Sequence, residues 1–331
     1  MNATAPGLTN RPFGTFRLML ALAVIPQHIG SPFLTGTCAV YAFFALSGFV
    51  IIEAADKVYP GRAVDFATNR FLRIVPPFIF ALMLAIIGYT VLVPSADLNA
   101  TNIAANFLAL IPGIEPTQSF MPYAWAIKVE LLFYAVVAVS LALRVPLGIP
   151  VAAAFACYML TGEPDVAAYI PFFAFGVCCY RGARALAAAC FIGCVVVASG
   201  LLDLNALAPL SAGALVAHLA LLAAMLLAIP ALASIRAGAF AKLDERLGRL
   251  SFPIYLQQHT AIVVISAFAI PSAWAVYGLA LALALMTIHL VEQPLTAVRK
   301  AVRKRHGSAD HVVDGTGGRH VGERSRTVGV V

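Results

Sequence analysis

Two ionisable residues, Arg17 and His28, lie in the first apolar stretch of this 331-residue chain. They are eleven positions apart, which on an α-helix is three turns plus about 20°, so both side chains project from one face. The rise of about 1.5 Å per residue separates them by roughly 16 Å along the helix axis. We interpret them as a cation at one end of a site and an imidazole for proton transfer at the other. The alternatives are an arginine that anchors the helix at a membrane boundary and a histidine bonded to a backbone carbonyl.

A second cationic pair, Arg70 and Arg73, directly precedes an apolar run that begins at Ile74. The spacing i, i+3 places both guanidinium groups on one face of a helix. Guanidinium groups match the geometry of phosphate oxygens. The pair therefore predicts a phosphate-binding site, with anchoring at the membrane interface as the alternative.

The third candidate is Glu130, which lies at the start of another apolar stretch. Lys128 is two positions away and points to a different helix face, which argues against an ion pair between the two. A carboxylate buried in a helical bundle can orient an imidazole or accept its proton. We therefore expect Glu130 to act with His28; the alternative is a structural hydrogen bond between helices.

Other polar residues in apolar stretches suggest weaker roles. Glu53 ends the second stretch, where we expect it to reach the interface by snorkelling. The polar run Gln257-Gln258-His259 interrupts a stretch of Leu, Ile and Val and predicts a cavity lining. The sequence contains no Walker loop, GxSxG elbow, HExxH helix or dinucleotide fingerprint.

The composition defines the class of protein that must position these residues. Hydrophobic residues make up 61% of the chain, charged residues 11%, and the mean hydropathy is +0.91. A soluble domain averages roughly 25% charged residues, because its surface must be solvated. These figures exclude a disordered chain and a soluble globular enzyme. We predict an all-α polytopic membrane protein.

Apolar stretches long enough to cross the hydrocarbon core recur along the chain and predict a bundle of about ten transmembrane helices. With both termini in the cytoplasm, 21 of the 22 Lys and Arg residues fall on the cytoplasmic side, and Lys128 is the exception. The net charge of +7 thus follows membrane topology and requires no nucleic-acid partner. The expected spans lie near residues 13–33, 37–55, 73–93, 123–143, 147–162, 166–180, 185–202, 206–232, 250–270 and 272–292.

These spans divide the chain into a cytoplasmic N-terminal segment 1–12, a transmembrane domain 13–294, and a basic cytoplasmic tail 295–331. In the tail we expect Arg299 to Arg305 to meet anionic headgroups, with disorder beyond. The longest outside loop, residues 94–122, contains an apolar patch from Asn106 to Ile111 that either lies on the membrane or folds back into the bundle.

Seven short segments, in order, resemble the acyltransferase-3 family of integral-membrane O-acyltransferases. The order of the segments is the specific signal, because each is short, and together they run from residue 16 to residue 294. They are Phe16-Arg17 with His28, Phe43-Phe44-Ala45-Leu46-Ser47-Gly48-Phe49, Asn69-Arg70 with Arg73-Ile74 and Pro76, Trp125 with Glu130 and Phe133-Tyr134, Phe173 with Phe175-Gly176, Leu247-Gly248 with Ser251 and Ile254-Tyr255-Leu256, and Glu292 with Pro294.

The resemblance implies transfer of an acyl group, usually acetyl, from cytoplasmic acyl-CoA to a hydroxyl of a surface or exported glycan. It implies a bacterial inner-membrane location, a glycan or glycolipid acceptor, and no metal cofactor. By position, His28 is similar to the family's essential histidine, acting as a general base or brief acyl carrier. Arg17, Arg70 and Arg73 are similar to the arginines that handle CoA. The separation of Arg17 and His28 is roughly the reach of a pantetheine arm.

The chain departs from the family pattern at two places. Many relatives have a second carboxylate after the tryptophan, whereas here Glu130 stands alone. The family's histidine three residues after the tyrosine is replaced by Gln258, and His259 follows it, for which we expect at most a secondary role. The competing hypothesis is a proton-coupled transporter or flippase with His28, Lys128 and Glu130 as its relay.

Overall fold

The computed structural model describes residues 11–30, 35–149, 151–153, 168–199, 211–270 and 272–304. Within these ranges the chain forms helices and connecting segments and contains no β-strand. The helices are α1 (Phe13–His28), α2 (Thr35–Lys57), α3 (Ala63–Leu92), α4 (Ala100–Phe107), α5 (Ala124–Leu143), α8 (Ile170–Arg181), α9 (Arg184–Ala198), α10 (Ala212–Ser234), α11 (Ala241–Ala267), α12 (Ala273–Thr287) and α13 (Gln293–Lys304). A 3₁₀ turn, Gly238–Phe240, precedes α11, and a π-helical segment, Ile288–Glu292, joins α12 to α13.

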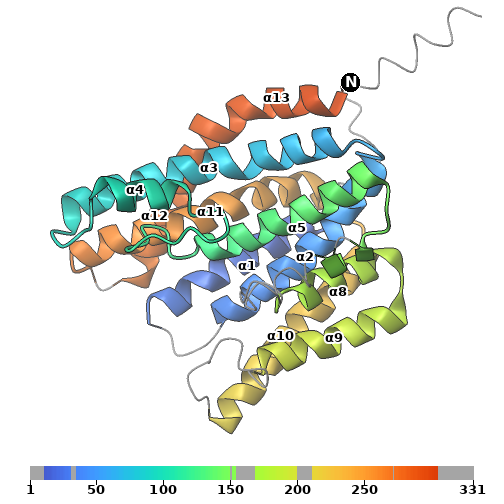
Figure 1. Ribbon diagram of the computed structural model, residues 1–331. Helices are drawn as coiled ribbons and strands as arrows, with labels where there is room; N and C mark the ends of the chain where they lie inside the picture. Colours follow the sequence, from blue (N-terminus) through green and yellow to red (C-terminus); the bar gives the residue numbers. More distant parts are fainter. Residues whose placement is uncertain are drawn as a thin grey trace, which may run out of the picture.

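The helices surround α2, most of whose side chains are buried. α2 packs against α1, α5, α8 and α10, while α11 packs against α1, α3 and α12. α13 lies along α3 on one side of the bundle, and α9 and α10 lie on the opposite side (Figure 1). The elements that carry the candidate residues, α1, α3, α5 and α11, therefore meet around one face of α2.

Two close helix crossings explain the glycines of the family-like segments. A Cβ atom on Gly176 of α8 would lie 1.8 Å from the Ala45 carbonyl oxygen, and one on Gly48 would lie 2.1 Å from that of Phe173. At the second crossing, a Cβ atom on Gly14 of α1 would lie 1.9 Å from the carbonyl oxygen of Asp244 in α11. Small residues allow backbones to approach this closely where no hydrophobic force drives membrane helices together.

Among the described residues, five helices are long and apolar enough to cross a membrane: α2, α3, α5, α10 and the combined segment Ala273–Arg303. This confirms the all-α membrane class, while the count of ten spans and the location of the termini stay predictions. Much of the expected span 147–162 and the start of 206–232 lie outside the described residues.

The largest differences from the expected boundaries occur where helices extend beyond the apolar stretch. α3 begins at Ala63, ten residues before the expected span, and α11 begins at Ala241, nine residues before it. Hydropathy locates only the part of a helix that lies in hydrocarbon, whereas the charged first turns of α3 and α11 remain helical outside it. Arg70 and Arg73 consequently lie inside a helix and not at its start.

The outside loop folds back on itself at Asn106 and leaves its apolar neighbours exposed. Asn102 and Asn106 of α4 are buried, and the Asn106 side chain donates to the Gln118 carbonyl over 2.9 Å and accepts from the Phe120 N–H over 2.8 Å. Phe107 and Ile111 are exposed. Asn106 is thus held by its own loop, and the two alternatives for the apolar patch stay predictions.

Candidate active site

A cavity in the bundle is lined by residues from α1, α2, α3, α5 and α11. It contains four of the five residues selected from the sequence, and we call it the arginine cavity. Its lining comprises Arg17, Val40, Phe43, Phe44, Ser47, Val50, Ile51, Arg70, Arg73, Ile74, Ala126, Ile127, Glu130, Tyr134, Ser251, Phe252 and Tyr255.

Three arginines converge on this cavity from two helices. Arg17 comes from α1, and Arg70 and Arg73 come from one face of α3, as their spacing predicted. The charge of Arg17 interacts with those of both α3 arginines. Arg70 is only 6% exposed, its guanidinium lies 5.5 Å from the centre of the Phe66 ring and 5.8 Å from that of Tyr134, and its Nε has no hydrogen-bond partner. None of the three forms an ion pair within 4 Å in the described part of the chain.

Glu130 lies in the arginine cavity and not beside His28. Its Oε1 accepts hydrogen bonds from the Ser47 hydroxyl over 2.8 Å and from the Tyr134 hydroxyl. His28 stacks instead on Tyr123, which is seven residues before Glu130, or about 10 Å along α5. The structure therefore does not bring Glu130 and His28 together, contrary to the expectation from sequence.

His28 ends α1 in a separate group of rings. Its ring centre lies 3.9 Å from that of Tyr123, and the Tyr123 ring centre lies 5.5 Å from that of His259. His259 Nε2 and the Tyr89 hydroxyl form a hydrogen bond of 2.9 Å, while His259 Nδ1 is buried without a partner. We call His28, Tyr89, Tyr123 and His259 the histidine cluster. His259, expected to be secondary at most, thus shares its surroundings with His28.

One face of α11 joins the arginine cavity to the histidine cluster. Tyr255 lines the cavity and donates a hydrogen bond of 3.0 Å to the carbonyl oxygen of Tyr123. Gln258, three residues further on the same face, is fully buried, and both polar atoms of its amide lack partners. A line of polar groups therefore connects the guanidinium groups with the imidazoles.

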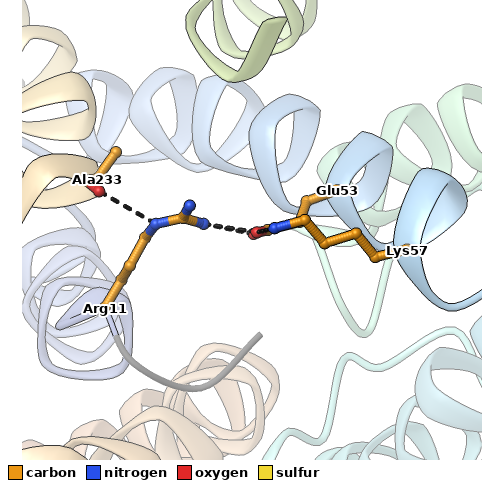
Figure 2. Close-up of polar contacts among 4 residues, drawn as sticks. All are labelled: Arg11, Glu53, Lys57 and Ala233. Atoms are coloured by element: carbon orange, nitrogen blue, oxygen red, sulfur yellow. Dashed lines mark hydrogen bonds and ion pairs between the residues drawn. The ribbon is translucent and has the colours of Figure 1, made fainter. Parts of the chain in front are cut away.

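The start of α1, which sets the position of Arg17, is fixed by two contacts. The Asp244 carboxylate of α11 accepts from the backbone N–H groups of Gly14 and Thr15 over 2.8 and 2.7 Å, capping the helix and complementing its dipole. Arg11, just before α1, bonds the Ala233 carbonyl over 3.1 Å and both oxygens of Glu53 over 2.7 Å (Figure 2).

This second contact corrects the expectation that Glu53 snorkels. Glu53 is 2% exposed and forms ion pairs of 2.7 Å with Arg11 and with Lys57. The i, i+4 spacing on α2 could have identified Lys57 as a partner of Glu53. Arg11 precedes Glu53 by 42 residues, so no local pattern indicates this pair. Lys128, as expected, does not pair with Glu130, and its partner is Glu115.

Sequence reasoning assigned no role to Ser47, Tyr134, Tyr89 or Tyr123. Tyr134 follows Glu130 by four residues, so helix geometry could have paired them. Ser47, Tyr89 and Tyr123 reach their partners from other helices, which no spacing within one helix reveals.

Comparisons with known proteins identify the family of the chain. The acyltransferase-3 family, described as an acyltransferase domain, matches residues 7–291. Over 122 residues the chain is 31% identical to an exopolysaccharide production protein, ExoZ, of Rhizobium meliloti (strain 1021). That alignment covers 35% of this chain and 37% of the relative. No solved structure matches the chain. The family match spans all the elements that build the arginine cavity and the histidine cluster, and the chain belongs to the acyltransferase-3 family.

Proposed function

We propose that the protein transfers an acetyl or other short acyl group from cytoplasmic acyl-CoA to a hydroxyl of an exported or surface glycan. One observation carries the proposal. Three arginines that form no ion pair within 4 Å among the described residues share a cavity, and a histidine lies on the same helix as one of them. Membership in an acyltransferase family supports the reaction class. The printed name of the relative, a protein of exopolysaccharide production, supports a glycan acceptor.

In this proposal the arginine cavity holds the phosphates of CoA. Guanidinium groups form charge-assisted hydrogen bonds to phosphate oxygens, and the buried Arg70 Nε without a partner offers one such donor. Because α1 is one continuous helix from Phe13 to His28, Arg17 and His28 are roughly 16 Å apart along its axis. A pantetheine arm held by its phosphates in the cavity extends along that distance toward the histidine cluster.

His28 acts as the general base in this mechanism. Its imidazole removes the proton of the acceptor hydroxyl, and the oxygen attacks the carbonyl carbon of the thioester. The C–S bond then breaks, the acyl group remains on the acceptor as an ester, and the CoA thiolate recovers the proton from the imidazolium. The hydrogen bond between Tyr89 and His259 fixes a second imidazole beside this position.

Glu130 takes a role on the donor side in this proposal. Its carboxylate shares the cavity with the arginines, and its charge interacts with that of Arg17. It offsets part of the positive charge of the empty cavity and competes with the donor phosphates, which favours release of CoA. We propose this role for Glu130 in place of the orientation of His28, which we expected from the sequence.

The cellular setting follows from the direction of transfer. Acyl-CoA is made in the cytoplasm and exported glycans are presented at the opposite face, so the enzyme belongs in the bacterial inner membrane as a multi-pass protein. Both termini are then cytoplasmic, on the side that receives the donor.

The test uses purified protein in nanodiscs with radiolabelled acetyl-CoA. In nanodiscs we expect saturable binding and slow thioester hydrolysis. In sealed vesicles that contain the protein we expect no uptake of label. Surface glycans of cells carrying His28→Ala at normal protein levels should lack the O-acyl groups that wild-type cells add. Uptake of a solute without any acyl-CoA binding would reject this function in favour of a transporter.

A further inference from the structure

The last helix of the described chain, α13, is held against α3 and not free on the membrane surface. Arg62 donates to the Val302 carbonyl over 3.0 Å, and the Asn69 amide donates to the Arg299 carbonyl over 3.3 Å. Val302 is buried, and Figure 1 shows α13 lying along α3. The sequence led us to expect that Arg299 to Arg305 meet anionic headgroups; most of this segment belongs to α13, which ends at Lys304.

The two sides of α13 differ in the way that they carry charge. Arg299 faces the bundle; its Nε is buried without a hydrogen-bond partner, and its charge interacts with those of Arg73 and Arg70. Lys300, one residue later and about 100° around the helix, is exposed. Arg299 does not line the arginine cavity but lies next to it, since its carbonyl oxygen accepts from Asn69, the neighbour of Arg70. Lys300 is exposed instead.

Arg299 raises the number of converging arginines to four, with Arg17, Arg70 and Arg73. In the described part of the chain none of these four takes part in an ion pair within 4 Å. Glu130 and Glu292 are the carboxylates whose charges interact with this group. Cations removed from water without partners are costly, so this arrangement calls for an anion with several charges.

We propose that α13 forms a wall of the donor site and that Arg299 binds the 3′-phosphate of acyl-CoA. Arg17, Arg70 and Arg73 remain for the pyrophosphate. A phosphomonoester carries about −1.5 to −2 charges at pH 7 and three acceptor oxygens, which suits a guanidinium with an unused buried N–H. This inference rests on the proposed function and adds a part of the donor that it recognises.

An anionic lipid headgroup is the other source of phosphate, and it is what we expected of this segment from sequence. A headgroup ligand would favour the exposed side of α13, where Lys300 lies, over the side that carries Arg299. The buried Nε of Arg299 and its interaction with the α3 arginines favour the cofactor.

The experiment compares acetyl-CoA with acetyl-3′-dephospho-CoA in thioester hydrolysis by the full-length protein in nanodiscs. We expect wild type to show a kcat/KM at least about 10-fold higher for acetyl-CoA, which is the scale of one charge-assisted hydrogen bond. Arg299→Ala should abolish this preference by lowering the kcat/KM for acetyl-CoA to the level of the dephospho donor. Lys300→Ala removes the same charge one residue away and should keep the preference; Arg299→Lys should keep part of it.

Three outcomes would overturn the inference. If Arg299→Ala lowered activity on both donors equally, the residue would be structural. If wild type did not discriminate between the donors, the 3′-phosphate would have no site, although the proposed function would stand. If Arg299→Ala and Lys300→Ala weakened binding to phosphatidylglycerol vesicles equally and the donor preference persisted, the ligand would be a headgroup. Failure of wild type to act on either donor would instead reject the proposed function itself.

Discussion

In the arginine cavity the guanidinium groups of the described chain form no ion pairs, whereas in the histidine cluster the rings are held by one another. Arg17, Arg70 and Arg73 have no carboxylate within ion-pair distance in the described part of the chain, while His28 stacks on Tyr123 and His259 bonds Tyr89. A site in which three arginines face one carboxylate is suited to an anionic ligand. A site in which rings pack on an imidazole is suited to holding it in one orientation for proton transfer. Under the proposed function the two ends of α1 serve binding and chemistry separately, so substitutions at each end should affect donor affinity and rate separately.

The largest effect is expected for His28→Ala. Loss of a general base lowers the rate by about 10²- to 10⁴-fold, and the Kd for acetyl-CoA should not change. Transfer and hydrolysis of radiolabelled acetyl-CoA give the rate, and equilibrium binding gives the Kd. The matched control is His289→Ala, since His289 is exposed on the π-helical segment and bonds Gln293. If the His28 variant kept the wild-type rate, the histidine cluster would have no role in the chemical step.

Arg73→Ala should weaken acetyl-CoA binding by about 10- to 100-fold, the range expected for a lost charge-assisted hydrogen bond of about 1.5–3 kcal/mol. The hydrolysis rate at saturating donor should remain near that of wild type. Arg181→Ala serves as the control, because Arg181 is exposed and lies 3.5 Å from Asp56, outside the cavity. An equal loss in both variants would mean that surface charge alone determines binding.

Tyr89→Phe removes the hydroxyl bonded to His259 and leaves the ring in place. A neutral hydrogen bond contributes about 0.5–1.5 kcal/mol, so the rate at saturating donor should fall about two- to tenfold, with unchanged donor affinity. Tyr277→Phe is the control, since its hydroxyl bonds the Leu22 carbonyl on the far side of α1. If the Kd changed and the rate did not, the histidine cluster would take part in donor binding.

The smallest effect is expected for Glu130→Gln, which tests whether Glu130 acts in the arginine cavity or in the histidine cluster. Loss of a negative charge among the arginines should tighten acetyl-CoA binding by about two- to fivefold, the size of a partly screened interaction between charges. The rate of the chemical step measured in a single turnover should not change. Glu115→Gln, on the exposed partner of Lys128, provides the control. A slower chemical step with an unchanged Kd would contradict this prediction and support the hypothesis that Glu130 acts with His28.

The family resemblance implied that Arg17 acts with Arg70 and Arg73, while the residues themselves predicted the membrane class, the main apolar helices and the common face of Arg70 and Arg73. These features are local, because they depend on hydropathy and on spacing within one helix. The sequence also predicted that Glu130 acts with His28. That prediction required the relative position of α1 and α5 along their axes, which is determined by packing and cannot be obtained from spacing within one helix. Tyr123 occupies the place beside His28, and Glu130 lies about 10 Å further along α5.

Other features were hidden because their partners are distant in the chain. Glu53 is buried only because Arg11 reaches it from before α1, and a lone carboxylate at the end of an apolar stretch gives no sign of that. Arg299 looked like one of several basic residues in a tail. Only the contact of α13 with α3 distinguishes it from Lys300.

The fixation of α1 at both ends has a consequence for the choice of substrate. Asp244 caps its N-terminus, and near its C-terminus the Gln27 amide oxygen accepts from the Thr37 N–H over 2.8 Å. Under the proposed function the helix between them is a spacer of constant length, so the distance from phosphate to thioester in the donor must match it. A carrier with a shorter or longer arm would bind by its phosphates and still hold its acyl group out of reach of His28. Selection of the carrier is therefore separate from selection of the acyl group, and a change in acyl preference can arise near His28 without rebuilding the phosphate site.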